Sequence, residues 1–171
     1  MKLVTIGLVG ACLASAWLMA AQKGTVTVTL MDLQGASIGT ATLSPAPDGG
    51  VSFALDVKNL PPGDHAFHVH QVAKCEPPFA SAGPHFNPEG KKHGLNNPAG
   101  PHAGDMSNVT VGADGTAMVT IVNPRVTLGD GANSVFANGG TALVIHAKAD
   151  DMMTDPAGNA GDRIACGVIA K

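Results

Sequence analysis

The sequence predicts an all-β domain in which eight short antiparallel strands form a flattened barrel or a sandwich. Several short runs alternate apolar and polar side chains with a period of two, which is typical of strands with one buried face. Glycine and proline are frequent, with 22 and 12 residues, while aromatic residues make up only 4% of the chain. This composition indicates many turns, and no run has the 3.6-residue period of an amphipathic helix.

Eight runs are expected to form the strands. The first shows the alternation clearly, because Thr25, Thr27 and Thr29 are separated by apolar residues. Residues 45–50 supply turn chemistry between the second and third runs, and residues 113–115 supply a hairpin signal between the fifth and sixth. We expect the strands at residues 24–31, 38–43, 51–57, 64–71, 106–111, 116–122, 141–148 and 163–170.

A chain of 171 residues is long enough for one domain with its own hydrophobic core. Its formal net charge is -3, and its basic residues form no run. This balance excludes the basic surface that nucleic acid requires, so we expect no nucleic-acid partner.

Residues 1–21 are typical of a secretory signal peptide, cleaved to leave a domain of residues 22–171. Lys2 gives the segment a positive start, an apolar run follows, and small residues lie near its end. The mature protein is then expected to have no membrane span. Two alternatives stay open: an uncleaved anchor, because about 18 apolar residues nearly span a bilayer, and a lipid-modified Cys12.

Export has a consequence for the cysteines. Cys12 leaves with the signal peptide, and Cys75 and Cys166 remain in an oxidising compartment. We therefore expect these two to form a disulfide, with two buried free thiols as the alternative.

The fourth expected strand carries a pair of histidines. Because side chains alternate along a strand, His68 and His70 share one face, while Phe67 and Val69 share the other. One face can pack in a core and the other can hold copper, nickel or zinc, since a neutral imidazole nitrogen is a ligand for all three. By itself the pair also fits two strand histidines that bind nothing.

Two long irregular spans follow, and the first is rich in histidine. Structureless loops longer than about 12 to 15 residues are usually functional or disordered. The span 74–105 contains His85, His93 and His102 and ends at Asp105. Three imidazoles and one carboxylate would complete a closed tetrahedral zinc site.

Counting the ligands raises the question of a shared histidine. His146, on the seventh expected strand, adds a sixth candidate, and His65 is left out because its parity differs from that of His68. Six histidines and Asp105 are one ligand fewer than two four-coordinate sites need. Either one imidazole binds both metals, or a single metal site has spare histidines, and the spacing does not decide between them.

Six blocks of sequence together resemble the copper/zinc superoxide dismutases. The resemblance runs from about Gly24 to the C-terminus and rests on the order and spacing of the histidines and Asp105. The blocks are FHVH at 67–70, SAGPHFNP at 81–88, KHG at 92–94, HAGD at 102–105, VIHAKADD at 144–151 and GNAGDRIACGVI at 158–169.

The resemblance implies an eight-stranded Greek-key barrel of the immunoglobulin-like sandwich type, with two long functional loops. It implies one copper and one zinc ion per subunit, with His85 bound to both. It also implies copper ligands at His68, His70 and His146, zinc ligands at His93, His102 and Asp105, a disulfide between Cys75 and Cys166, an orienting carboxylate at Asp150, and an arginine beside the copper channel at Arg163.

The activity that the resemblance implies is dismutation of superoxide to dioxygen and hydrogen peroxide, an antioxidant defence. His85 would deliver a proton to the second superoxide, and the always-charged guanidinium of Arg163 would dock the anion. The alternative is a dismutase-like module that binds copper and zinc without catalysis. A missing copper ligand or arginine would have favoured it, and neither is missing.

The second long span departs from part of the family. Between His146 and Arg163 it is shorter than in the cytosolic eukaryotic enzymes and lacks their glutamate and lysine steering cluster. This short span and the signal peptide resemble the exported bacterial branch, which favours the periplasm, with secretion as the alternative and a homodimer as one assembly. The candidates for steering the anion, each of which is otherwise a solvated surface charge, are Lys74, Lys91, Lys92 and Lys148.

Overall fold

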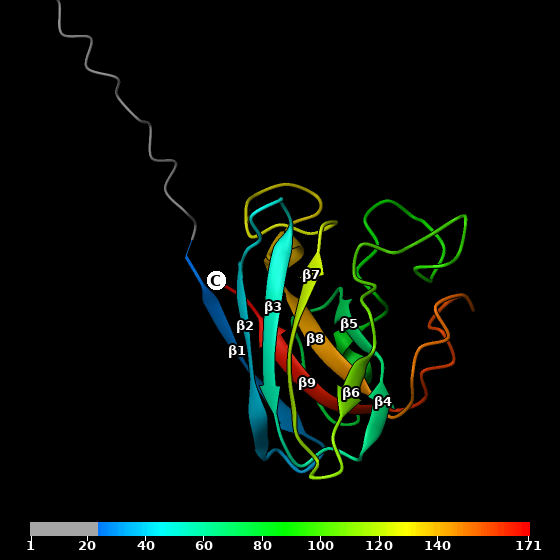
Figure 1. The fold of residues 1–171 in the computed structure, drawn as a ribbon. Coiled ribbons are helices and arrows are strands. Elements are labelled where there is room, and N and C mark those ends of the chain that lie inside the picture. The colour runs from blue at the N-terminus through cyan, green and yellow to red at the C-terminus, as the bar shows by residue number, and fades with distance from the viewer. Residues whose placement is uncertain (1–23) are drawn as a thin grey trace, which may run out of the picture.

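The computed structural model describes residues 24–171, which form an all-β domain (Figure 1). The expected signal peptide, residues 1–21, and Cys12 lie outside the described residues. None of the helices in the described range is long and apolar enough to cross a membrane. The elements are β1 (Val26–Asp32), β2 (Ser37–Pro45), β3 (Val51–Val57), β4 (Gly63–His65), β5 (Phe67–His70), η1 (Ala80–Ala82), β6 (Val109–Val111), β7 (Ala117–Asn123), η2 (Ala137–Gly139), β8 (Thr141–His146) and β9 (Arg163–Ile169).

Seven strands form one curled antiparallel sheet in the order β5-β8-β9-β1-β2-β3-β7. The other two, β4 and β6, pair with each other. Because β4 runs into β5 and β6 runs into β7, this pair lies between the two edge strands of the curled sheet (Figure 1). The arrangement confirms the predicted all-β fold and is consistent with a Greek-key barrel.

Alternation along the strands separates the core from the surface. In β3, Val51, Phe53 and Leu55 are buried, whereas Ala54 and Asp56 are exposed. The inward side chains of the other strands join the same apolar cluster inside the curled sheet. Burial of apolar surface stabilises a fold by about 25 cal/mol per Å², so this cluster fixes which face of each strand points inward.

The predicted fourth strand is divided into β4 and β5 at Ala66. The N–H of Ala66 donates to the carbonyl of Lys148 at 2.8 Å, and its carbonyl accepts from the N–H of His146 at 2.9 Å. At this residue the chain changes its pairing partner from β6 to β8. The prediction of one continuous strand was therefore wrong, because a period of two does not reveal a change of partner.

The fifth expected strand, 106–111, is also shorter than predicted, because β6 begins only at Val109. The side chain of Asn108 forms two hydrogen bonds with the backbone of Asp150. Its Nδ2 donates to the Asp150 carbonyl at 3.0 Å, and its Oδ1 accepts from the Asp150 N–H at 2.8 Å. Asn108 thus holds a distant loop in place.

Two long loops lie on the same side of the barrel (Figure 1). The first loop is residues 71–108, between β5 and β6, and the later loop is residues 147–162, between β8 and β9. Two hydrogen bonds join the loops directly. The N–H of Asn96 donates to the carbonyl of Met152 at 2.9 Å, and the side-chain amide of Asn97 donates to the carbonyl of Met153 at 3.1 Å.

The expected disulfide between Cys75 and Cys166 is present, with a Cα–Cα distance of 5.7 Å. It ties the start of the first loop to β9. A small second apolar cluster surrounds it, formed by buried residues that include Phe79 and Val144. The bridge therefore anchors the first loop to the side of the sheet that carries the histidines.

Reduction of this disulfide is expected to lower the free energy of unfolding. The two cysteines are 91 residues apart, for which the chain-entropy relation gives an upper value of about 4.6 kcal/mol. Denaturant unfolding with and without reductant measures the change, and a Cys75→Ser variant, which has no bridge, should not respond to the reductant. An unchanged unfolding midpoint in the wild-type protein would contradict the prediction.

Candidate metal centre

The fold brings all six candidate histidines and Asp105 into two adjacent groups. Within each group the ligand atoms lie within 4.8 Å of one another, and every side chain is buried. His85 belongs to both. The first group is His68, His70, His85 and His146, and the second group is His85, His93, His102 and Asp105.

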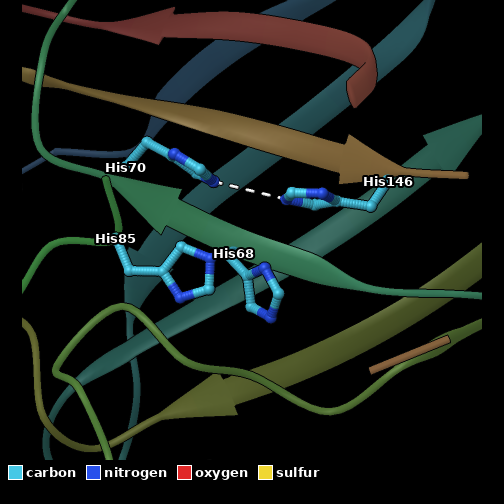
Figure 2. A group of neighbouring side chains, drawn as sticks. All are labelled: His68, His70, His85 and His146. Carbon is cyan, nitrogen blue, oxygen red and sulfur yellow. Dashed lines mark hydrogen bonds between the residues drawn. The ribbon is translucent and has the colours of Figure 1, made fainter. Parts of the chain in front are cut away.

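In the first group, His68 and His70 extend from β5 and His146 from the end of the neighbouring β8 (Figure 2). Nδ1 of His70 lies 2.8 Å from the carbonyl oxygen of Gly83, and Nδ1 of His146 lies 3.2 Å from that of Gly161. A carbonyl oxygen only accepts hydrogen bonds, so both Nδ1 atoms carry the ring proton. Both Nε2 atoms, 3.4 Å apart, therefore present lone pairs to the group.

The second group is built around the carboxylate of Asp105. Its Oδ1 lies 2.9 Å from Nδ1 of His85, 3.0 Å from Nδ1 of His93 and 3.4 Å from Nδ1 of His102. Its Oδ2 accepts backbone N–H groups of His102 and Gly94, each at 2.9 Å, which fixes the carboxylate. Tetrahedral zinc with bonds of about 2.0–2.1 Å holds its ligand atoms about 3.3 Å apart, so the spacing fits zinc.

His85 lies between the two groups. Its backbone pairs with that of His70, and its Nδ1 faces Asp105. Its Nε2 faces the first group, is buried and has no hydrogen-bond partner among the described residues. One imidazole thus presents a nitrogen to each group, which is the first of the two arrangements that the ligand count left open.

Unpaired buried nitrogens show that the first group fits a cation. Nδ1 of His68 and Nε2 of His85 are buried and unpartnered within residues 24–171. Leaving a buried polar atom unpaired costs about 1–3 kcal/mol. A metal ion in the first group would accept both lone pairs and remove this cost.

Asp150 connects the two groups. Its Oδ2 accepts from Nε2 of His68 at 2.8 Å, and its Oδ1 accepts from Nε2 of His93 at 3.0 Å. The carboxylate thereby fixes both tautomers and turns the opposite ring nitrogens toward the two groups. Gly158 packs so closely on Asp150 that a Cβ atom would collide with Oδ1, and its φ of 61° also favours glycine.

Two of the rings are neutral at pH 7, and a third is held between two carboxylates. Burial lowers the pKa of His85 to about 4 and that of His146 to about 3, so both rings are neutral at pH 7, as metal ligands must be. Burial also opposes the charged form of His93, but the hydrogen bonds that its ring donates to Asp105 and Asp150 raise its pKa to about 9. The space between these two carboxylates therefore favours positive charge.

Arg163 lies at the start of β9, beside the first group. Its guanidinium donates to the carbonyls of Phe79 at 2.6 Å and Gly83 at 2.7 Å, and the Gly83 carbonyl also accepts from His70. Arg163 is half-buried and lines a surface cavity of about 500 Å³ together with Gly161. Arg163 therefore places a positive charge at the cavity, and its two hydrogen bonds also hold the first loop against β9.

Three of the four candidate steering lysines pair with carboxylates at the surface. In contrast, the side chain of Lys148 lies against Gly161, which lines the same cavity as Arg163. This makes Lys148 the lysine best placed to act with the arginine. The three pairs are Lys74 with Glu76 at 2.9 Å, Lys91 with Glu89 at 2.7 Å and Lys92 with Asp155 at 3.0 Å.

Two residues that hold the second group were missed from the sequence. Asn123 is fully buried and donates to the carbonyl of Ala103 at 2.8 Å, and the guanidinium of Arg125 donates to the carbonyl of Asp105. Both support the turn at 102–105. The alternation along β7 could have revealed Asn123, because it places Asn123 on the same inward face as Ile121. No pattern in the sequence indicates the role of Arg125.

Comparisons with known proteins agree with this geometry. A family model for copper/zinc superoxide dismutase matches residues 37–169. Among curated proteins, copper-zinc superoxide dismutase 2 of Aquifex aeolicus (strain VF5) is 54% identical over 143 residues, which is 82% of this chain and 83% of that protein. Copper-zinc superoxide dismutase 1 of the same organism is 51% identical over 152 residues, which is 87% of this chain and 89% of that protein.

Solved structures extend the comparison. A superoxide dismutase-like protein from Bacillus subtilis is similar with a TM-score of 0.80 and 39% identity, over 83% of this chain and 96% of that one. The copper/zinc superoxide dismutase from Brucella abortus is similar with a TM-score of 0.71 and 30% identity, over 85% of this chain and 99% of that one. Sequence and fold together show that the chain belongs to the copper/zinc superoxide dismutase family.

Proposed function

We propose that this protein dismutates superoxide to dioxygen and hydrogen peroxide, with copper in the first group and zinc in the second. The observation that carries the proposal is the position of His85, whose two ring nitrogens face two buried sets of ligands at once. Imidazole nitrogens suit both ions, and a closed set of three imidazoles and one carboxylate suits zinc.

Seven side chains then bind one copper and one zinc ion per subunit. His85 binds both ions. Asp150 orients His68 and His93 through their remote nitrogens. The remaining copper ligands are His68, His70 and His146, and the remaining zinc ligands are His93, His102 and Asp105.

The residues of the chain supply binding and proton transfer. Copper, when bound, supplies the one-electron redox chemistry, which zinc lacks. One superoxide is oxidised to dioxygen, and a second takes up one electron and two protons to become hydrogen peroxide. Nε2 of His85 carries one of these protons, and the guanidinium of Arg163, which shares the Gly83 carbonyl with His70, docks each anion.

A superoxide-decay assay tests the proposal directly. The mature protein loaded with copper and zinc is expected to accelerate decay strongly over the metal-free protein. Equal decay from the two preparations would remove the catalytic claim. That result would support the alternative, a dismutase-like module that binds metals without catalysis. This alternative is not favoured, because all the metal ligands and Arg163 are present.

Replacing Asp105 with alanine is expected to remove zinc before copper. The change deletes one of four zinc ligands and the carboxylate that three ring nitrogens face, but no copper ligand. Loss of even an outer hydrogen-bond partner weakens metal binding about 10- to 100-fold, so loss of a direct ligand should exceed that range. Metal analysis after dialysis against a weak chelator measures the change.

The matched control is Asp48→Ala, which removes an exposed carboxylate from the turn before β3. It should keep both metals. Stoichiometric zinc in the Asp105→Ala protein would contradict the assignment of the second group to zinc.

We also infer that residues 1–21 direct export to the periplasm and that the mature domain is 22–171. The disulfide and the similarity to bacterial superoxide dismutases support this. The mass of the protein recovered from a periplasmic fraction tests it, and recovery of the uncleaved chain from the cytoplasm would contradict it. A homodimer is proposed as the assembly, and sedimentation of the same material tests that.

A further inference from the structure

The later loop places a second carboxylate beside the zinc ligands. Oδ1 of Asp155 accepts the backbone N–H of His93 at 2.8 Å and lies 3.9 Å from Nε2 of His102. The longer distance is an electrostatic contact rather than a direct hydrogen bond. Because Asp150 bonds to the ring of His93, two carboxylates of one loop flank the second group from different sides.

Asp155 is charged and fixed in position. Its carboxylate accepts the N–H of His93 at 2.8 Å through Oδ1 and the ammonium of Lys92 at 3.0 Å through Oδ2. The preceding turn is held by the carboxylate of Asp151, which accepts the N–H of Thr154 at 2.8 Å. Asp155 therefore presents a defined negative charge to His102.

A cavity next to Asp155 is where the second group meets solvent. His102 is 7% exposed and His85 is 4% exposed, whereas His93 and Asp105 are fully buried. The two slightly exposed rings line a cavity of about 370 Å³, and Asp155 lies on its wall. The second group is therefore nearest to solvent at His85 and His102, on the side where Asp155 lies.

Metal binding would strengthen the contact with His102. Its Nδ1 faces the second group, and an ion bound there withdraws electron density from the ring and makes the Nε2 proton a stronger donor. A nearby carboxylate stabilises that polarised ring and makes it a better ligand. The attraction between Asp155 and the ring of His102 is therefore stronger when zinc is bound than when it is absent.

We propose that Asp155 is a positioning residue for zinc, which holds His93 and His102 around the ion and slows its release. This inference rests on the proposed assignment of zinc to the second group. Asp155 acts through the two ligands and does not itself contact the metal.

An Asp155→Asn variant tests the proposal, because the amide oxygen can still accept the His93 N–H while the charge is lost. We expect zinc release from the copper- and zinc-loaded protein into excess chelator to be about 10- to 100-fold faster, since that is the usual effect of losing such a partner. With cobalt(II) in place of zinc, the visible absorption bands should shift, because the orientation of His102 changes. Copper content should stay as in the wild type.

The matched control is Asp48→Asn, which makes the same change of charge at an exposed carboxylate in the turn between β2 and β3. Its zinc release and cobalt spectrum should equal those of the wild type. Equal release from Asp155→Asn and wild type, or equally fast release from both variants, would overturn the proposal. If the wild-type protein binds no zinc at all, the assignment of the second group fails first, so the two failures are distinguishable.

Discussion

Replacing His146 with alanine is expected to lower the superoxide-decay rate of the metal-loaded protein by at least about 100-fold. The side chain supplies one of four lone pairs in the first group, where its Nε2 lies 3.4 Å from that of His70. Loss of a residue that only hydrogen-bonds to a metal ligand weakens metal binding about 10- to 100-fold, so loss of a ligand itself should weaken it more. The second group does not contain His146, so zinc should be retained.

Two measurements separate this effect from misfolding. Metal analysis should find zinc near one per chain and depleted copper, and thermal unfolding should remain cooperative. A Thr120→Ala variant, which changes an exposed position on β7, should behave as the wild type in both assays. Full activity with copper bound in the His146→Ala protein would contradict the assignment of the first group.

Replacing Arg163 with alanine should slow superoxide decay about 10-fold or more while the metal content stays normal. Electrostatic steering as a whole raises encounter rates by about 10 to 1000-fold, of which one guanidinium supplies a part, and the net charge of -3 makes a local positive charge more important. The rate should also lose part of its dependence on ionic strength, because screening acts on the charge that was removed. Stopped-flow decay at several salt concentrations measures both effects.

An Arg163→Lys variant separates the charge from the bracing of the first loop. Lysine keeps the positive charge but lacks the planar fork that donates to the carbonyls of Phe79 and Gly83 together. If docking dominates, Arg163→Lys should keep the salt dependence and most of the rate. A wild-type rate and salt dependence in the alanine variant would exclude the docking role.

The strand pattern could be predicted because it is local. Phe67 and Val69 pack in the main core while His68 and His70 lie in the first group, as the period of two requires. The break at Ala66 could not be predicted, because it depends on which distant strand pairs with the chain on either side. The same holds for Asn108, which bonds to the distant Asp150 and lies outside the following strand.

The residue types and their order follow from the sequence alone: six imidazoles and one carboxylate in two histidine-bearing strands and a long loop, and two cysteines expected to pair. Which ring nitrogen faces which group depends on how the loops fold. His85 stands between two sets of ligands because both loops fold back over β5 and β8, and Asp150 and Arg125 fix the rings and the turn around them. The physical reason is that side-chain parity follows from the backbone alone, whereas the convergence of ligands from distant segments depends on hydrogen bonds that form only when the loops close.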